Sequence, residues 1–154
     1  MASRIIGCGG YLPKKILTNS DLEKIIDTSD EWITSRTGIR QRHVAAEDEN
    51  ASDMGFEAAK KAIEHAKIDK NQIDLIIVCT NTGDKTFPSV ANKIHGLLRL
   101  GQTPSFDLQA ICSGFLYGMH VADKLIKSGA YNTILLVCSE KMSSILDWQD
   151  RRTC

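Results

Sequence analysis

The sequence lacks the features that mark membrane, secreted and nucleic-acid-binding proteins. No apolar run approaches the ~18 residues that a membrane-spanning helix needs, and no secretory signal pattern opens the chain. The 19 basic and 19 acidic residues cancel, so there is no net charge to favour nucleic acids or membrane surfaces. These absences predict a cytoplasmic globular protein that binds neither nucleic acid nor a membrane.

Cysteine pairs and metal-ligand clusters are also lacking. The five cysteines are odd in number and include no C-x-x-C spacing, and none of the four histidines has another histidine or a cysteine three or four residues away. Cys8, Cys79 and Cys138 lie in apolar, strand-like runs, where a free thiol packs as a small hydrophobic side chain. We expect reduced thiols, inert packing for these three, and no metal site.

Strand-like and helix-like segments alternate along the chain. Strands are expected at residues 4–9, 74–80, 105–108 and 133–138, of which 74–80 and 133–138 are apolar runs of the buried parallel-strand type. Long amphipathic helices are expected from Ser52, from Pro88 and from Cys112, the last with an apolar face of Phe115, Met119, Ala122 and Ile126. Two capping-box patterns, at residues 20–23 and 28–31, predict two short helices between the first strand and the helix from Ser52. The alternation predicts an α/β fold whose parallel sheet has helices on both faces.

Cys112 directly follows a predicted strand and opens a predicted helix. Unpaired backbone N–H groups and the dipole at a helix N-terminus stabilise an anion, so they favour the thiolate that attacks thioesters. Gly114 leaves room for a close approach, and nearby N–H groups suit an oxyanion. The position also suits a small buried hydrophobic residue, so it leaves both interpretations open.

Several motifs occur in the order and spacing of one enzyme family. They are G-C-G-G-Y-L-P at residues 7–13, T-S-D-E-W-I at 28–33, R-T-G-I-R-Q-R at 36–42, F-P-S at 87–89, A-I-C-S-G-F at 110–115 and D-R at 150–151. With these motifs the chain resembles the N-terminal half of the β-ketoacyl-acyl carrier protein synthases III, which are thiolase-like condensing enzymes. The block at residues 28–42 is the most specific, since so long a string does not recur by chance.

The resemblance implies an acyltransferase that initiates fatty acid synthesis. Acetyl-CoA or another short acyl-CoA would acylate Cys112, and decarboxylative condensation with malonyl-acyl carrier protein would then give acetoacetyl-acyl carrier protein. Coenzyme A enters as a thioester substrate, and no tightly bound cofactor is implied. In the family, a histidine and an asparagine of the C-terminal half serve the decarboxylation. We expect that half to be absent here, which would leave the chain inactive alone.

The resemblance also assigns a coenzyme A site, made of Thr28, Trp32, Arg36, Thr37 and Arg151. An indole ring can stack on adenine, and planar guanidinium groups match phosphates. Taken singly, each residue has a structural alternative: Thr28 as an N-cap, Trp32 as core, and the arginines as solvated side chains. Arg152 stands where the family often has a small residue, which changes the charge near the cofactor phosphates.

Phe87 precedes Pro88 and would ordinarily anchor the entry to a helix. In the family this phenylalanine walls the acyl pocket of the partner subunit, so the resemblance implies a homodimer and a short acyl primer. The implied fold is a thiolase-like half with a mixed, mostly parallel five-stranded sheet, forming a single N-terminal domain over residues 1–154. The last residues show no helix end, so we expect a truncated chain.

Two alternatives remain open. The first is a non-catalytic α/β interaction module in which Cys112 is part of the core and no thiol is reactive. The second is another thiolase-like condensing enzyme, of the type that makes hydroxymethylglutaryl-CoA or a polyketide. Acylation of Cys112 by acetyl-CoA would distinguish the synthase from the interaction module. Use of malonyl-acyl carrier protein rather than acetyl-CoA as the second substrate would distinguish it from the other condensing enzymes.

Overall fold

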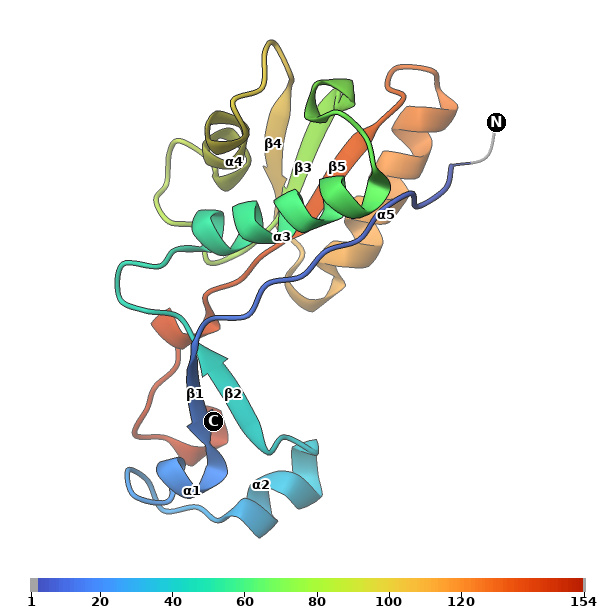
Figure 1. Cartoon of the computed structure of the whole chain (residues 1–154). Coiled ribbons are helices and arrows are strands. Elements are labelled where there is room, and N and C mark those ends of the chain that lie inside the picture. The colour runs from blue at the N-terminus through green and yellow to red at the C-terminus, as the bar shows by residue number, and fades with distance from the viewer. Residues whose placement is uncertain (1–2, 154) are drawn as a thin grey trace. The chain divides into compact units, whose positions relative to one another are not determined.

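The computed structural model describes residues 3–153, which group into two compact units (Figure 1). The larger unit comprises residues 3–11 and Asn50–Glu140, and the smaller comprises Leu12–Glu49 and residues 141–153. No helix in this part of the chain is long and apolar enough to cross a membrane.

The larger unit is built on a parallel sheet with the strand order β4-β3-β5. The strands are β3 (Leu75–Cys79), β4 (Ser105–Leu108) and β5 (Ile134–Cys138). All five residues of β3 are buried, because neighbouring strands flank it and helices cover both of its faces. Three of the predicted strands, at residues 74–80, 105–108 and 133–138, are therefore confirmed, and they pair in parallel.

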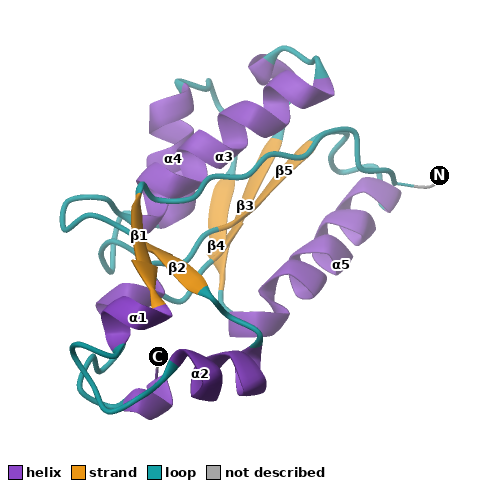
Figure 2. Ribbon diagram, turned by 60° about the horizontal axis from the view of Figure 1, so that its bottom comes forward, coloured by secondary structure: helices purple, strands orange, loops and turns teal. Residues whose placement is uncertain are grey.

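Three helices cover this sheet: α3 (Ala51–Ala66), α4 (Val90–Leu98) and α5 (Gly114–Lys127). Figure 2 shows α3 and α4 on one face and α5 on the other. The side chains of β3 alternate accordingly, with Ile76 and Val78 in the core under α3 and α4, and Leu75 and Ile77 in the core under α5. The α/β architecture predicted from the sequence is confirmed.

The face of α5 that packs on the sheet differs from the predicted one. Its buried residues are Gly114, Gly118 and Ala122, whereas Phe115 is exposed. A side chain at Gly118 would collide with Leu136 of β5, so the absence of one lets the helix backbone approach the strands closely. Phe115, Leu116 and Tyr117 are exposed, whereas Val121 and Leu125 pack against the core beside Ala122.

The predicted strand at residues 4–9 is wrong, since this segment has no strand pairing. It runs against α3 instead, where the backbone at Gly9 lies so close to Ala62 that no side chain would fit. The Cys8 amide donates to His65 Nδ1 at 3.0 Å, and Lys61 Nζ donates to the Gly10 carbonyl at 2.9 Å. Backbone groups that a strand would use are thus bonded to helix side chains.

The expected five-stranded sheet is likewise corrected, because the five described strands are divided between two sheets. The second sheet belongs to the smaller unit and pairs β1 (Lys15–Thr18) with β2 (Gln41–Val44) in antiparallel register. Two short helices, α1 (Asn19–Leu22) and α2 (Asp30–Thr37), complete the loop between these strands.

The two short helices begin at caps other than those predicted. Thr18 caps α1 in a reciprocal pair with Asp21, and Ser29 Oγ caps α2 by accepting from the Trp32 amide at 3.0 Å. In α1, Asp21 takes the role that the predicted capping box gave to a glutamate. The buried Asn19 joins both helices to β2, because its amide nitrogen donates to Asp30 Oδ1 and its oxygen accepts from Arg42.

Candidate functional site

Cys112 lies in the single 3₁₀ turn Ile111–Ser113, which leads directly into α5. The turn follows β4 and leaves the cysteine exposed. The predicted position at a helix start is confirmed, with α5 itself beginning two residues later at Gly114. An exposed thiol at this position can meet a substrate, and the start of a helix favours an anion there.

The other cysteines have different surroundings. Cys79 is buried behind the turn, where burial and the neighbouring Cys138 raise the pKa of its thiol to about 12. Partial burial also raises the pKa of Cys138. Cys8 and Cys138 are exposed, so the expectation that they pack in the core is wrong, while for Cys79 it is confirmed. The raised pKa values leave Cys79 and Cys138 as thiols at neutral pH.

The turn that carries Cys112 has an unusual backbone and a partner that sequence reasoning missed. Ile111 has φ 48°, in the left-handed region that β-branched residues rarely adopt. Its amide donates to the Asn81 side-chain oxygen at 2.9 Å, from the loop that follows β3. On the other side of the cysteine, Cys79 Sγ donates to the Gly114 carbonyl at 3.1 Å.

A second group of predicted residues comes together in the smaller unit. The guanidinium carbon of Arg36 lies 4.5 Å from the centroid of the Trp32 ring, and that of Arg151 lies 5.2 Å from it. Trp32 and Arg36 are one turn apart on α2, whereas Arg151 opens the 3₁₀ turn Arg151–Thr153 near the end of the chain. Two cations therefore gather around one half-buried aromatic ring.

The two predicted threonines have unequal hydrogen-bonding states. Thr37 Oγ1 is engaged at the end of α2, donating to the Ile33 carbonyl at 2.8 Å and accepting from the Ile39 amide at 3.0 Å. Thr28 does not cap α2, and its buried Oγ1 has no hydrogen-bond partner among the described residues. A buried hydroxyl without a partner is costly unless a ligand or water satisfies it.

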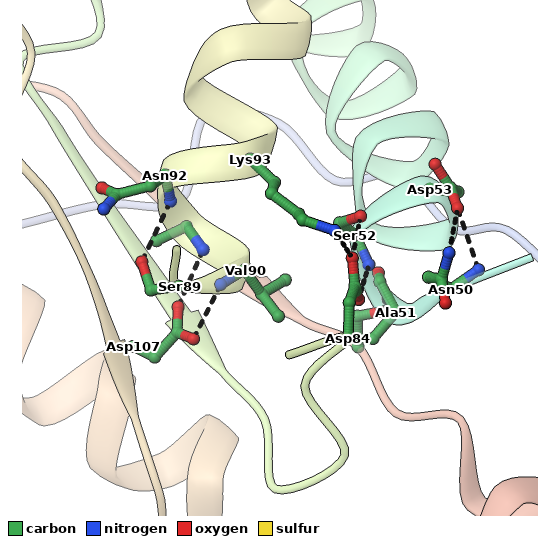
Figure 3. A network of polar contacts seen from close by, with 12 residues as sticks. Asn50, Ala51, Ser52, Asp53, Asp84, Ser89, Val90, Asn92, Lys93 and Asp107 are labelled. Carbon is green, nitrogen blue, oxygen red and sulfur yellow. Dashed lines mark hydrogen bonds and ion pairs between the residues drawn. The ribbon is translucent and has the colours of Figure 1, made fainter. Parts of the chain in front are cut away.

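Phe87 projects from the loop between β3 and α4 with 81% of its surface exposed. Two buried networks fix this loop, as Figure 3 shows. Asp84 accepts from the Ser52 amide at 3.0 Å and from Lys93 Nζ at 2.8 Å. Asp107 of β4 accepts from the first two amides of α4. The exposed phenylalanine is thus part of an ordered loop.

The site residues divide between the two units. Cys112 and Phe87 belong to the larger unit, and Thr28, Trp32, Arg36, Thr37 and Arg151 belong to the smaller one. Within residues 3–153 there is no group of three or more histidine, cysteine or acidic side chains that could hold a metal ion.

Comparison with known proteins supports the predicted relationship. The family profile of 3-oxoacyl-[acyl-carrier-protein (ACP)] synthase III matches residues 106–154. A β-ketoacyl-[acyl-carrier-protein] synthase III of Rickettsia akari is 56% identical over the whole chain, which covers 49% of that protein. The chain thus spans about half the length of the curated relatives it matches.

Solved structures agree with this. The crystal structure of 3-oxoacyl-[acyl-carrier-protein] synthase III from Aquifex aeolicus matches with a TM-score of 0.95 and 49% identity, over 98% of this chain and 49% of that one. The priming β-ketosynthase of the R1128 polyketide pathway matches with a TM-score of 0.92 and 36% identity, over 96% of this chain and 44% of that one. The chain has the α/β fold of thiolase-like condensing enzymes. Within that class, it corresponds along its whole length to about half of a β-ketoacyl-acyl carrier protein synthase III.

Proposed function

We propose that this chain supplies the acyl-accepting thiol and part of the coenzyme A site of a β-ketoacyl-acyl carrier protein synthase III. The observation that carries the proposal is the exposed Cys112 in the turn that opens α5, in a motif shared with the family. The neighbouring Cys79 is unsuited to the same role, because it is buried and its pKa is raised to about 12.

In the proposed reaction the Cys112 thiolate attacks the carbonyl carbon of acetyl-CoA. A carbon–sulfur bond to the enzyme forms, the bond to coenzyme A breaks, and coenzyme A leaves as a thiolate that takes up a proton. Backbone amides at the start of α5 are suited to stabilise the intermediate oxyanion. Malonyl-acyl carrier protein then loses carbon dioxide, and its carbanion attacks the acyl group to release acetoacetyl-acyl carrier protein and the free Cys112 thiolate.

We assign the nucleotide end of coenzyme A to the surface around Trp32. Adenine can stack on the indole, Arg36 and Arg151 can bind phosphate oxygens, and the unsatisfied Thr28 hydroxyl can bond a polar group of the ligand. Thr37 is expected at the edge of this surface. No tightly bound cofactor is part of the proposal, since coenzyme A enters and leaves as a substrate.

The proposal extends to the assembly. Residues 1–154 would be the N-terminal domain of a cytoplasmic homodimer, with Phe87 walling the acyl pocket of the partner subunit and selecting short primers. The exposure of Phe87 on an ordered loop supports this role. The family's decarboxylating histidine and asparagine would come from sequence outside residues 1–154.

Labelled acetyl-CoA tests the proposal on the gene product that carries this chain. We expect one acetyl label per chain on Cys112, located by peptide mass spectrometry. Cys112→Ala should abolish labelling, whereas Cys138→Ala, which removes another exposed cysteine, should retain it. Label that persists in Cys112→Ala, or no label in the unmodified protein, would exclude the assignment and favour a non-catalytic module.

A further inference from the structure

The residue before Cys112 holds a backbone conformation that its own side chain disfavours. Ile111 has φ 48°, and a β-branched side chain crowds the backbone in this left-handed region. The Ile111 side chain is 66% exposed, so packing around it does not hold the conformation. Other contacts must hold the left-handed backbone of Ile111, because a strained backbone conformation persists only where the surrounding structure enforces it.

Two hydrogen bonds from the end of β3 hold the turn on either side of Cys112. The Asn81 side-chain oxygen accepts the Ile111 amide at 2.9 Å, and Cys79 Sγ donates to the Gly114 carbonyl at 3.1 Å. Cys79 is the last residue of β3, and Asn81 lies in the bend that follows two residues later. These two residues therefore bond to the chain on both sides of Cys112.

Asn81 is itself anchored by the strand next to β3. Glu140, which follows β5, accepts the Asn81 amide at 2.8 Å and the Thr82 amide at 2.9 Å. The same carboxylate accepts the hydroxyl groups of Thr80 and Thr82. Charge-assisted bonds of this kind are stronger than neutral ones, so the loop that presents the Asn81 side chain is fixed.

We propose that Asn81 is a positioning residue, which aims the Cys112 thiol by holding Ile111 in its left-handed conformation. The inference rests on the proposed role of Cys112 as nucleophile. Loss of the tether lets Ile111 relax to an ordinary φ, and this rotates the peptide that carries Cys112. Displacement of a reacting atom by about 1 Å can cost on the order of 100-fold in rate. Binding of coenzyme A is assigned to other residues, so affinity should not change.

The test compares four variants of the gene product that carries this chain: Asn81→Ala, Ile111→Gly, the double variant, and the control Asn71→Ala at an exposed site. We expect Asn81→Ala to lower kcat for acetyl transfer about 10- to 100-fold, with KM for acetyl-CoA within about twofold. Ile111→Gly should recover most of that loss in the double variant, because glycine adopts positive φ without strain. Asn71→Ala should behave as the unmodified protein.

Amide hydrogen exchange tests the tether without reference to catalysis. In Asn81→Ala we expect faster exchange at Ile111, with an unchanged melting temperature. A kcat within twofold of the unmodified protein, or a loss that Ile111→Gly does not restore, would overturn the inference. If Cys112→Ala retained the acetyl label, the proposed function would fail instead, while unchanged Ile111 exchange in Asn81→Ala would refute the tether independently.

Discussion

At the level of single residues, the surroundings of Trp32 suit the proposed binding of coenzyme A. A structural tryptophan is normally enclosed by apolar neighbours, but this ring lies within about 5 Å of two guanidinium groups. Arg36 is also held by the Trp32 carbonyl, and Arg151 by the Asp27 carbonyl. These bonds restrict the arginines before any ligand arrives, which lowers the entropy cost of binding a phosphate.

Replacement of the ring should separate binding from chemistry. We expect Trp32→Ala to raise KM for acetyl-CoA about tenfold and to leave kcat within twofold, because base stacking contributes about 1–3 kcal/mol and Trp32 is assigned no part in the acyl transfer. Steady-state kinetics on the gene product that carries this chain measures both constants. Trp148→Phe is the matched control and should leave KM unchanged. A lower kcat with an unaltered KM would contradict the assignment.

At the level of elements, the loop between β3 and α4 depends on Asp84. Burial raises the pKa of this carboxyl, but hydrogen bonds from Lys93 and Ser52 outweigh that effect, and the pKa is lowered overall from 3.8. The ion pair with Lys93 is nearly enclosed on the aspartate side, with 2% of that side chain exposed. A buried charge of this kind joins the start of α3 to α4 (Figure 3).

Stability should therefore depend on the Asp84 charge. We expect Asp84→Asn to lower the free energy of unfolding by about 3 kcal/mol at pH 7, because it leaves Lys93 without its counter-charge. A carboxyl with a lowered folded pKa stabilises fully above its unfolded value near 3.8 and loses that contribution as pH falls through the folded value. Urea unfolding should thus show a smaller difference at pH 3 than at pH 7. The exposed Glu64→Gln serves as control, and a difference that grew towards low pH would refute the assignment.

Elements with a self-contained pattern were predictable from the sequence. The apolar run of β3 and the stripes of α3 and α4 carry their own periodicity, and all three are confirmed. Residues 4–9 were also predicted as a strand but form none, because pairing depends on a neighbouring edge that no local pattern describes. The packed face of α5 was predicted only in part: Ala122 is buried as expected, but Gly114 and Gly118 were missed because glycines do not mark an apolar stripe.

The candidate site was predictable to a similar extent. The strand-to-helix junction located Cys112, and the spacing of Trp32 and Arg36 places them on neighbouring turns of one helix. The approach of Arg151 to Trp32 came only from the family resemblance, since the two are far apart in the sequence. The sequence did not predict the roles of Asn81 and Glu140, because both bind backbone amides, and such partners leave no signature in side-chain motifs.

At the level of the whole molecule, the larger unit exposes several large apolar side chains near Cys112. Ile111, Phe115, Leu116 and Tyr117 are all more than half exposed at the start of α5, beside Cys112. Exposed apolar side chains that gather near one site are typical of an interface. Together with the half-length match to the relatives, this supports an active site completed by further sequence.

Residues 1–154, produced alone, should not decarboxylate malonyl-acyl carrier protein. The proposed nucleophile belongs to these residues, whereas His120, the histidine of α5, lies two turns beyond Cys112 and is poorly placed to serve it. We expect no release of labelled carbon dioxide from malonyl-acyl carrier protein above the rate without enzyme, from protein shown to be folded by circular dichroism. The longer gene product is the positive control. Release by residues 1–154 at the rate of that control would show that the decarboxylating groups lie within this chain.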